Sequence, residues 1–126
     1  MSQRVALSDD VQQKLSPWYS RQLLEGTRIL RDSFLGTVLG WFGQAAVTVN
    51  GTVHLTPRAG DLESTAGVAL LAHELYHVLQ EREQGWWRYL ARYVWHWRPS
   101  HIRRGWEHPL ERPAYARQNE VRRALA

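Results

Sequence analysis

The stretch Ala72–His77, which reads AHELYH, decides how the whole chain is expected to fold. Its two histidines, His73 and His77, are four residues apart, and side chains at that spacing lie one above the other on the same face of a helix. Both imidazoles can therefore reach one metal ion, while Glu74 between them can point at a water molecule on that ion. HExxH on a helix is the pattern in which two histidines bind zinc and the glutamate serves as general base.

The residues on either side of this motif indicate that its helix is buried. The apolar run Val68–Leu71 leads into the motif, and Leu75 and Val78 continue the apolar pattern. Burying two histidines and a glutamate costs free energy unless each finds a partner. A shared metal ion supplies that partner, which favours a metal site over two unrelated histidines on an ordinary helix.

Two short runs rich in β-branched residues, 46–49 and 52–55, lie on either side of Asn50-Gly51. Asn-Gly between two such runs is the strongest short-range signal for a β-hairpin. The motif helix is expected to follow, from about residue 64 to residue 83, and Gly85 is expected to end it.

Other signals predict further elements around this centre. Either Asp61 or Ser64 can cap the motif helix at its N-terminus. The first helix is expected to begin at Ser8-Asp9-Asp10, to be bent or split at Pro17 and to end at Gly26. The remaining expected elements are a strand over 27–31, a short helix over 35–42, a helix over 86–97, and a last helix that begins at His108-Pro109.

Length and composition bound the possible classes of protein. A chain of 126 residues predicts a single domain over 1–126, and no run of 18 apolar residues exists, so no membrane span is expected. The first ten residues lack a signal-peptide pattern. A cytoplasmic location is therefore expected, with later export by a non-classical route left open. Because there is no cysteine, nitrogen and oxygen atoms must hold any metal.

The charge distribution leaves a second class of function open. The chain has a net charge of +4, with fifteen arginines, one lysine and seven tryptophans. Helix 86–97 is expected to pack an aromatic stripe inward and to leave an arginine side in water. The stripe is Trp86, Leu90, Tyr93 and Trp97, and the wet side is Arg88, Arg92 and His96. The alternative is a nucleic-acid or membrane-surface binder, built on Arg88, Arg92, Arg98, Arg103 and Arg104 with Trp86, Trp87, Trp95, Trp97 and Trp106.

A catalytic zinc ion usually has three protein ligands and one open position for water. The HExxHxxGxxH arrangement is absent, because residue 83 is a glutamate. A glutamate from a later helix is therefore the natural third ligand, and the candidates are Glu107, Glu111 and Glu120. Glu111 is best placed, since it lies in the first turn or so of the last predicted helix.

Three segments carry a resemblance to a known family: HELYHVLQ at 73–80, GWWRYLARY at 85–93 and HPLERPAYA at 108–116. They resemble the small HExxH–Glu zinc metallopeptidase domains called minigluzincins, and the related HExxH domain found with bacterial contractile injection systems. In those domains HExxHxxQ is followed by an aromatic helix and a segment of the type NPxExEAY. The resemblance extends over roughly 45–115, although His108 stands where the family prefers Asn and Pro113 where it often has an acid.

The resemblance implies an α+β, gluzincin-like fold, in which a short twisted sheet with the hairpin at about 46–55 packs on the HExxH helix and the rest is mostly helical. It implies one Zn²⁺ per chain, with His73, His77 and Glu111 as ligands and Glu74 as general base. Tyr115, one turn after Glu111, is expected either to bond a ligand or to act as a catalytic hydrogen-bond donor, or else to be a packing residue. The candidate hydrogen-bond donors to the oxyanion that forms during peptide hydrolysis are His96, His101, His108, Tyr89, Tyr93 and Tyr115.

The expected function is zinc-dependent hydrolysis of peptide bonds by a monomer acting on a peptide or protein substrate. The strand of Thr52, Val53, His54 and Leu55 is expected to form the sheet edge over the cleft and to bind the substrate as an added strand, although His54 reads most simply as a strand-surface residue. The tail 116–126 either covers the zinc in a latent form or packs as a final helix. The alternatives are a non-catalytic zinc-stabilised interaction module and, less favoured, the arginine- and tryptophan-rich binder.

Overall fold

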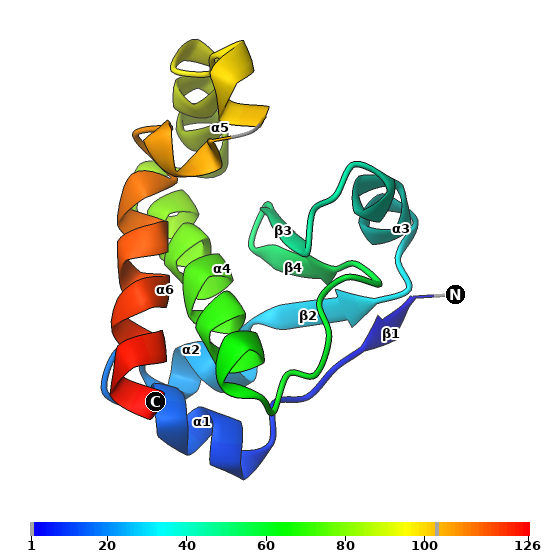
Figure 1. Cartoon of the computed structure of the whole chain (residues 1–126), viewed down its shortest axis with the longest axis vertical. Helices are drawn as coiled ribbons and strands as arrows, with labels where there is room; N and C mark the ends of the chain where they lie inside the picture. Colours follow the sequence, from blue (N-terminus) through cyan, green and yellow to red (C-terminus); the bar gives the residue numbers. More distant parts are fainter. Residues whose placement is uncertain (1, 103) are drawn as a thin grey trace.

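The computed structural model describes residues 2–102 and 104–126 and shows an α+β domain (Figure 1). This confirms the predicted fold class. The strands in the described part of the chain are β1 (Gln3–Arg4), β2 (Arg28–Arg31), β3 (Ala46–Val49) and β4 (Thr52–Leu55). The helices there are α1 (Asp9–Leu15), α2 (Arg21–Gly26), α3 (Phe34–Trp41), α4 (Thr65–Gln84), α5 (Trp86–Trp95) and α6 (Arg112–Leu125), with short 3₁₀ turns η1 (Pro99–Ile102) and η2 (Gly105–Glu107).

Serine side chains start the first four helices. In each case the serine oxygen accepts a hydrogen bond from the backbone N–H three residues later, which satisfies one of the unpaired donors of a helix N-terminus. The capping serines are Ser8, Ser20, Ser33 and Ser64. Pro17 lies between α1 and α2, so the predicted split of the first helix is confirmed.

The sheet has the strand order β1-β2-β4-β3. Strands β3 and β4 form the predicted antiparallel hairpin, with Val47 opposite His54 and with positive φ at Asn50 and Gly51. Strand β4 also pairs in parallel with β2, where Ile29 lies opposite Val53. Both sides of β4 are therefore occupied, and the edge strands of the sheet are β1 and β3.

The prediction that Thr52, Val53, His54 and Leu55 form the sheet edge is wrong. That prediction relied on the strand lying next to the motif helix in the sequence. In the structure the chain crosses from β2 to β4 through α3 and β3, and the parallel β2–β4 pairing encloses β4.

Helix α4 passes between the sheet and α6, which lies alongside it (Figure 1). Its apolar residues Leu71 and Leu75 are fully buried, as are Val53 of β4 and Val121 of α6. Because the middle of α4 is enclosed on several sides, its polar side chains also lie away from water. The predicted bounds of this helix, about 64 to 83, agree closely with Thr65–Gln84.

Gly85 separates α4 from α5, with a φ of 83° that side-chain-bearing residues rarely adopt. It lets the chain change direction, and α5 then projects from the end of α4 (Figure 1). Helix α5 ends at Trp95, two residues earlier than predicted. No helix in residues 2–102 and 104–126 is long and apolar enough to cross a membrane, as the sequence predicted.

The last helix begins at Arg112 and not at His108-Pro109. The His108 carbonyl accepts hydrogen bonds from the backbone N–H groups of Glu111 and Arg112, at 2.9 and 2.8 Å, so residues 108–111 form a turn. This turn places Glu111 at the N-cap of α6. Strand β1 was not predicted, because two residues carry no periodic signal.

Candidate metal centre

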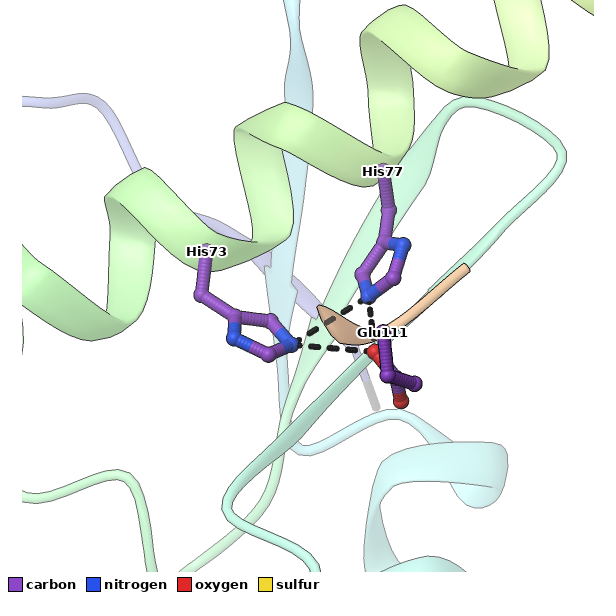
Figure 2. Close-up of side chains that lie close together, drawn as sticks. All are labelled: His73, His77 and Glu111. Atoms are coloured by element: carbon purple, nitrogen blue, oxygen red, sulfur yellow. Dashed lines mark hydrogen bonds and ion pairs between the residues drawn. The ribbon is translucent and has the colours of Figure 1, made fainter. Parts of the chain in front are cut away.

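His73 and His77 lie one turn apart on α4, and their imidazoles point to the same side of the helix (Figure 2). Both side chains are buried, and their Nε2 atoms are 3.2 Å apart. Helical spacing thus brings two nitrogen donors together as the motif predicts.

Glu111 reaches the same point from the N-cap of α6 (Figure 2). Its Oε1 lies 3.2 Å from His73 Nε2 and in close contact with His77 Nε2. The three potential ligand atoms lie within 4.8 Å of one another. Of the three glutamates considered as third ligand, the structure brings Glu111 to the histidines.

The other two glutamates are held at the surface. Glu107 pairs with Arg104 at 3.4 Å, and Glu120 pairs with Arg117 at 3.2 Å.

The chemistry of these three atoms fits a cation. A neutral imidazole offers one lone pair on its unprotonated nitrogen, and a carboxylate oxygen offers only lone pairs. Three such atoms facing one another repel unless a positive charge lies among them. Two imidazole nitrogens and one carboxylate oxygen are also a ligand set that catalytic zinc uses.

The charges around His77 show how strongly this point attracts positive charge. Burial alone would lower the pKa of His77, but the hydrogen bond and the charge of Glu111 raise it to about 9. Conversely, burial would raise the pKa of Glu111, and its hydrogen bonds with His73 and His77 hold that pKa well below its usual range. In the metal-free chain a proton is therefore held where a metal ion can bind.

Gln80 fixes which nitrogen of His77 faces the cluster. Its Nε2 donates to the carbonyl of Leu110 at 3.0 Å, so its Oε1 must face His77 Nδ1, 2.8 Å away. An amide oxygen can only accept, so Nδ1 carries the proton and Nε2 keeps its lone pair for a metal. The hydroxyl oxygen of Tyr89 lies 3.0 Å from the same Nδ1. The position of Gln80, three residues after His77, is the sequence signal that could have assigned it this role.

His73 differs from His77, because its Nδ1 is buried and has no hydrogen-bond partner among the described residues. The ring of Tyr115 packs edge-on against the His73 ring, with 4.4 Å between centroids. Tyr115 therefore packs directly on a candidate ligand. Its role as a catalytic donor stays a prediction.

Glu74 lies beside the cluster and is held by β3, an edge strand of the sheet. The hydroxyl of Thr48 on β3 donates to Glu74 Oε2 at 2.7 Å. Glu74 is 4% exposed and lines the cleft together with both histidines. One carboxylate oxygen is thus fixed in place, and no reasoning from the sequence had indicated that Thr48 would do this.

Tyr93 and His108 support Glu111 from α5 and from the preceding turn. The Tyr93 hydroxyl donates to Glu111 Oε2 at 3.1 Å. His108 is fully buried, accepts the Leu110 N–H on Nδ1 at 3.0 Å and donates from Nε2 to the Tyr93 carbonyl at 2.8 Å. Both ring nitrogens of His108 are therefore committed to backbone groups, which removes it from the candidates for stabilising an oxyanion.

A cleft of about 610 Å³ opens over the candidate ligands. Strand β3 forms one wall and α5 the opposite wall, with α6 and η2 contributing side chains. The residues that line it include Val47, Thr48, Val49, Leu70, Trp86, Tyr89, Leu90, Tyr93, His101, Trp106, Tyr115 and Gln118.

The residues predicted to bind substrate, Thr52, Val53, His54 and Leu55, are not among those that line the cleft. His54 Nδ1 instead lies 2.9 Å from the hydroxyl of Ser33. His96 is exposed at the end of α5, whereas His101 does line the cleft. The tail 116–126 lies mostly in α6, which packs along α4, so the structure favours a packed final helix over a segment that covers the site.

The sequence model of the eCIS core domain family matches residues 6–85, well over half of the chain. The chain therefore belongs to the eCIS core domain family, where eCIS stands for extracellular contractile injection system. The predicted relation to a domain of contractile injection systems is confirmed. The matched region contains His73, Glu74 and His77 and ends before Glu111. No curated protein and no solved structure matches the chain.

Proposed function

We propose that this chain is a zinc-dependent metalloendopeptidase of the minigluzincin type, which acts on peptide segments in the setting of a contractile injection system. The observation that carries the proposal is the convergence of His73, His77 and Glu111 beside a buried glutamate, Glu74, at the floor of an open cleft. A site with a purely structural metal needs no carboxylate held beside the ligands.

The three converging residues would hold the metal, and Gln80 would keep the His77 Nε2 lone pair directed toward it. Zinc bound there would supply Lewis acidity, polarising the scissile carbonyl and bringing the pKa of a water molecule to about 7. Without cysteine in the chain, oxygen and nitrogen ligands account for the whole site.

Glu74 performs the proton transfers. It takes a proton from the attacking water and delivers it to the nitrogen of the leaving amine, which is the role of a general base that becomes a general acid. Thr48 binds one carboxylate oxygen and leaves the other free to face the cleft. The Tyr93 hydroxyl is committed to Glu111, whereas Tyr115 lines the same cleft and is the hydroxyl group available to stabilise the oxyanion.

The substrate binds as an extended peptide along β3. This strand is the edge strand that lines the cleft, so its free backbone groups can pair with a peptide as an added strand. The strand proposed to bind the substrate is therefore residues 46–49, and not residues 52–55 as expected from the sequence.

The test is cleavage of a fluorogenic peptide library by the zinc-loaded chain, compared with the Glu74→Gln variant. Glutamine keeps the size of the side chain and an oxygen for Thr48 but cannot accept the proton. We expect the variant to keep its zinc and to lose at least about a hundredfold in kcat, the lower range of general-base contributions. Cleavage that persists at full rate in Glu74→Gln contradicts the mechanism, and stoichiometric zinc without cleavage of any peptide supports a zinc-stabilised interaction module instead.

A further inference from the structure

The outer side of α5 carries a surface that the metal centre does not use. Tyr89, Leu90 and Tyr93 face the cleft, whereas the opposite side of the helix is in water. We call this exposed side the α5 outer face; it comprises Trp87, Arg88, Ala91, Arg92, Val94 and Trp95.

The apolar part of the α5 outer face is large and continuous along the helix. Trp87 is 78% exposed, Val94 66% and Trp95 80%. Their spacings of seven and eight residues place them on one side of the helix, with Ala91 between them. Two tryptophans exposed to this degree on the same side of one helix mark this face as a surface for contact.

The charge next to this apolar strip is entirely positive. Residues 84–106 contain five arginines, five tryptophans and no aspartate or glutamate, while the whole chain has a net charge of only +4. This segment therefore holds all of the net positive charge. Within the described part of the chain, no carboxylate lies within ion-pair distance of Arg88, Arg92 or Arg98.

We propose that the α5 outer face docks this protein on the surface of an anionic lipid bilayer. Indole rings favour the boundary between headgroups and hydrocarbon, because one end is apolar and the other can donate a hydrogen bond. Arginines beside them can keep their stems on the apolar layer and their guanidinium groups among lipid phosphates. Basic residues clustered on and next to an amphipathic helix are typical of binding to anionic lipid, and here Arg88 and Arg92 lie on the face while Arg98 follows the helix. No described helix can span a membrane, so the proposed contact is with the bilayer surface.

The same face is less suited to nucleic acid. Proteins that bind single strands stack bases on aromatic rings along a positively charged groove. Helix α5 projects from the end of α4 (Figure 1), its outer face does not line the cleft, and Val94 and Ala91 in its strip offer nothing to a base or a phosphate. A bilayer accepts such side chains, since their transfer from water is favourable.

The test is sedimentation of the intact chain with vesicles of phosphatidylcholine alone or mixed with phosphatidylserine. Two variants change the face, Trp87→Ala/Trp95→Ala and Arg88→Gln/Arg92→Gln. The matched control is Trp41→Ala, because Trp41 is 75% exposed on α3, a helix without charged residues. Circular dichroism and zinc content verify that each variant is folded, and these exposed positions are not expected to affect either.

We expect binding to vesicles that contain phosphatidylserine and little binding to phosphatidylcholine alone. Each arginine near an anionic surface contributes roughly a fivefold gain in affinity, so Arg88→Gln/Arg92→Gln should bind roughly 25-fold more weakly. Trp87→Ala/Trp95→Ala should bind at least about tenfold more weakly, because two large apolar side chains no longer leave water. Trp41→Ala should bind as the parent chain does.

Three results would overturn the proposal. The first is no sedimentation with phosphatidylserine vesicles at low salt. The second is a loss of vesicle binding in Trp41→Ala as large as that in Trp87→Ala/Trp95→Ala, or vesicle binding by Trp87→Ala/Trp95→Ala that equals that of the parent chain. The third is tighter binding to a single-stranded oligonucleotide than to anionic vesicles at the same salt concentration, which would make the face a nucleic-acid surface.

Discussion

At the scale of single residues, the side chains around the metal centre divide into those that would touch the metal and those that hold them. His73, His77 and Glu111 present three lone-pair atoms to one point. Gln80 hydrogen-bonds His77 and Thr48 hydrogen-bonds Glu74, and neither is one of the three candidate ligands. Substitutions of the two groups should therefore affect zinc affinity and catalysis to different degrees.

Removing Glu111 should cost more zinc affinity than removing any residue that only supports a ligand. We expect Glu111→Ala to weaken zinc binding by more than about a hundredfold, because loss of a supporting partner already costs 10–100-fold. Competition with a chromophoric chelator measures the affinity. The control is Glu120→Ala, whose carboxylate pairs with Arg117. Equal zinc affinity in Glu111→Ala and Glu120→Ala would mean that Glu111 is not a ligand.

Gln80→Ala should weaken zinc binding by roughly 10–100-fold while leaving the ligands themselves in place. The alanine neither accepts from His77 Nδ1 nor donates to the Leu110 carbonyl, so both the tautomer of His77 and the turn before Glu111 are released. Gln84→Ala is the matched control, since Gln84 lies one turn later on α4 and bonds Arg92 at the surface. A chelator competition that ranks the two variants equally would remove this role from Gln80.

At the scale of elements, local signals predicted most helices and the hairpin, because each rests on neighbours in the sequence. The HExxH spacing predicted that His73 and His77 share one face of α4. The Asn50-Gly51 pair predicted the β3–β4 turn, and Pro17 predicted the break between α1 and α2. The start of α6 was missed, because the turn at residues 108–111 depends on the His108 side chain and on Gln80 from another helix.

Glu81 ties the hairpin to α4, since its Oε2 accepts the N–H of Gly51 at 2.5 Å, while its Oε1 is buried and has no hydrogen-bond partner in the part of the chain that the structure describes. Burial raises the pKa of Glu81 above its ordinary 4.5, although the Gly51 hydrogen bond opposes this. A carboxyl whose pKa is raised by folding stabilises the fold when protonated and loses that contribution as the pH rises.

The free energy of unfolding of the chain, relative to that of Glu81→Gln, should therefore decrease between pH 4 and pH 7. Denaturant titrations of the chelator-treated proteins measure this difference. Glu83→Gln, on the same helix but exposed, is the control and should show a difference that changes less with pH. If the free energy of unfolding of the parent chain relative to Glu81→Gln increased with pH, the Gly51 hydrogen bond would outweigh the cost of burial.

At the scale of the whole molecule, the order of the strands could not be predicted from the sequence. The parallel pairing of β2 with β4 joins segments separated by α3 and β3, and no local pattern encodes that β4 is paired on both sides. For the same reason the Thr48–Glu74 hydrogen bond was not foreseen, because it requires β3 to lie over α4. The three candidate ligands could be predicted because two lie in one motif and the third lies in a segment with family resemblance.

A metal that joins α4 to the start of α6 should stabilise the entire domain. Zinc at a thousand times its dissociation constant adds about 4 kcal/mol, which corresponds to a rise in Tm of roughly 10 °C or more for a domain of this size. Differential scanning calorimetry with zinc and with chelator measures the shift. Glu111→Ala should show little of it, and a Tm that zinc leaves unchanged in the parent chain would place the ion outside the folded core.

The most direct test of the central claim is the zinc-edge X-ray absorption spectrum of the zinc-loaded chain. Two imidazole nitrogens from His73 and His77 at about 2.0 Å, together with oxygen scatterers, are the predicted coordination. A spectrum with one imidazole or none, or a chain that retains no zinc to measure, would contradict it.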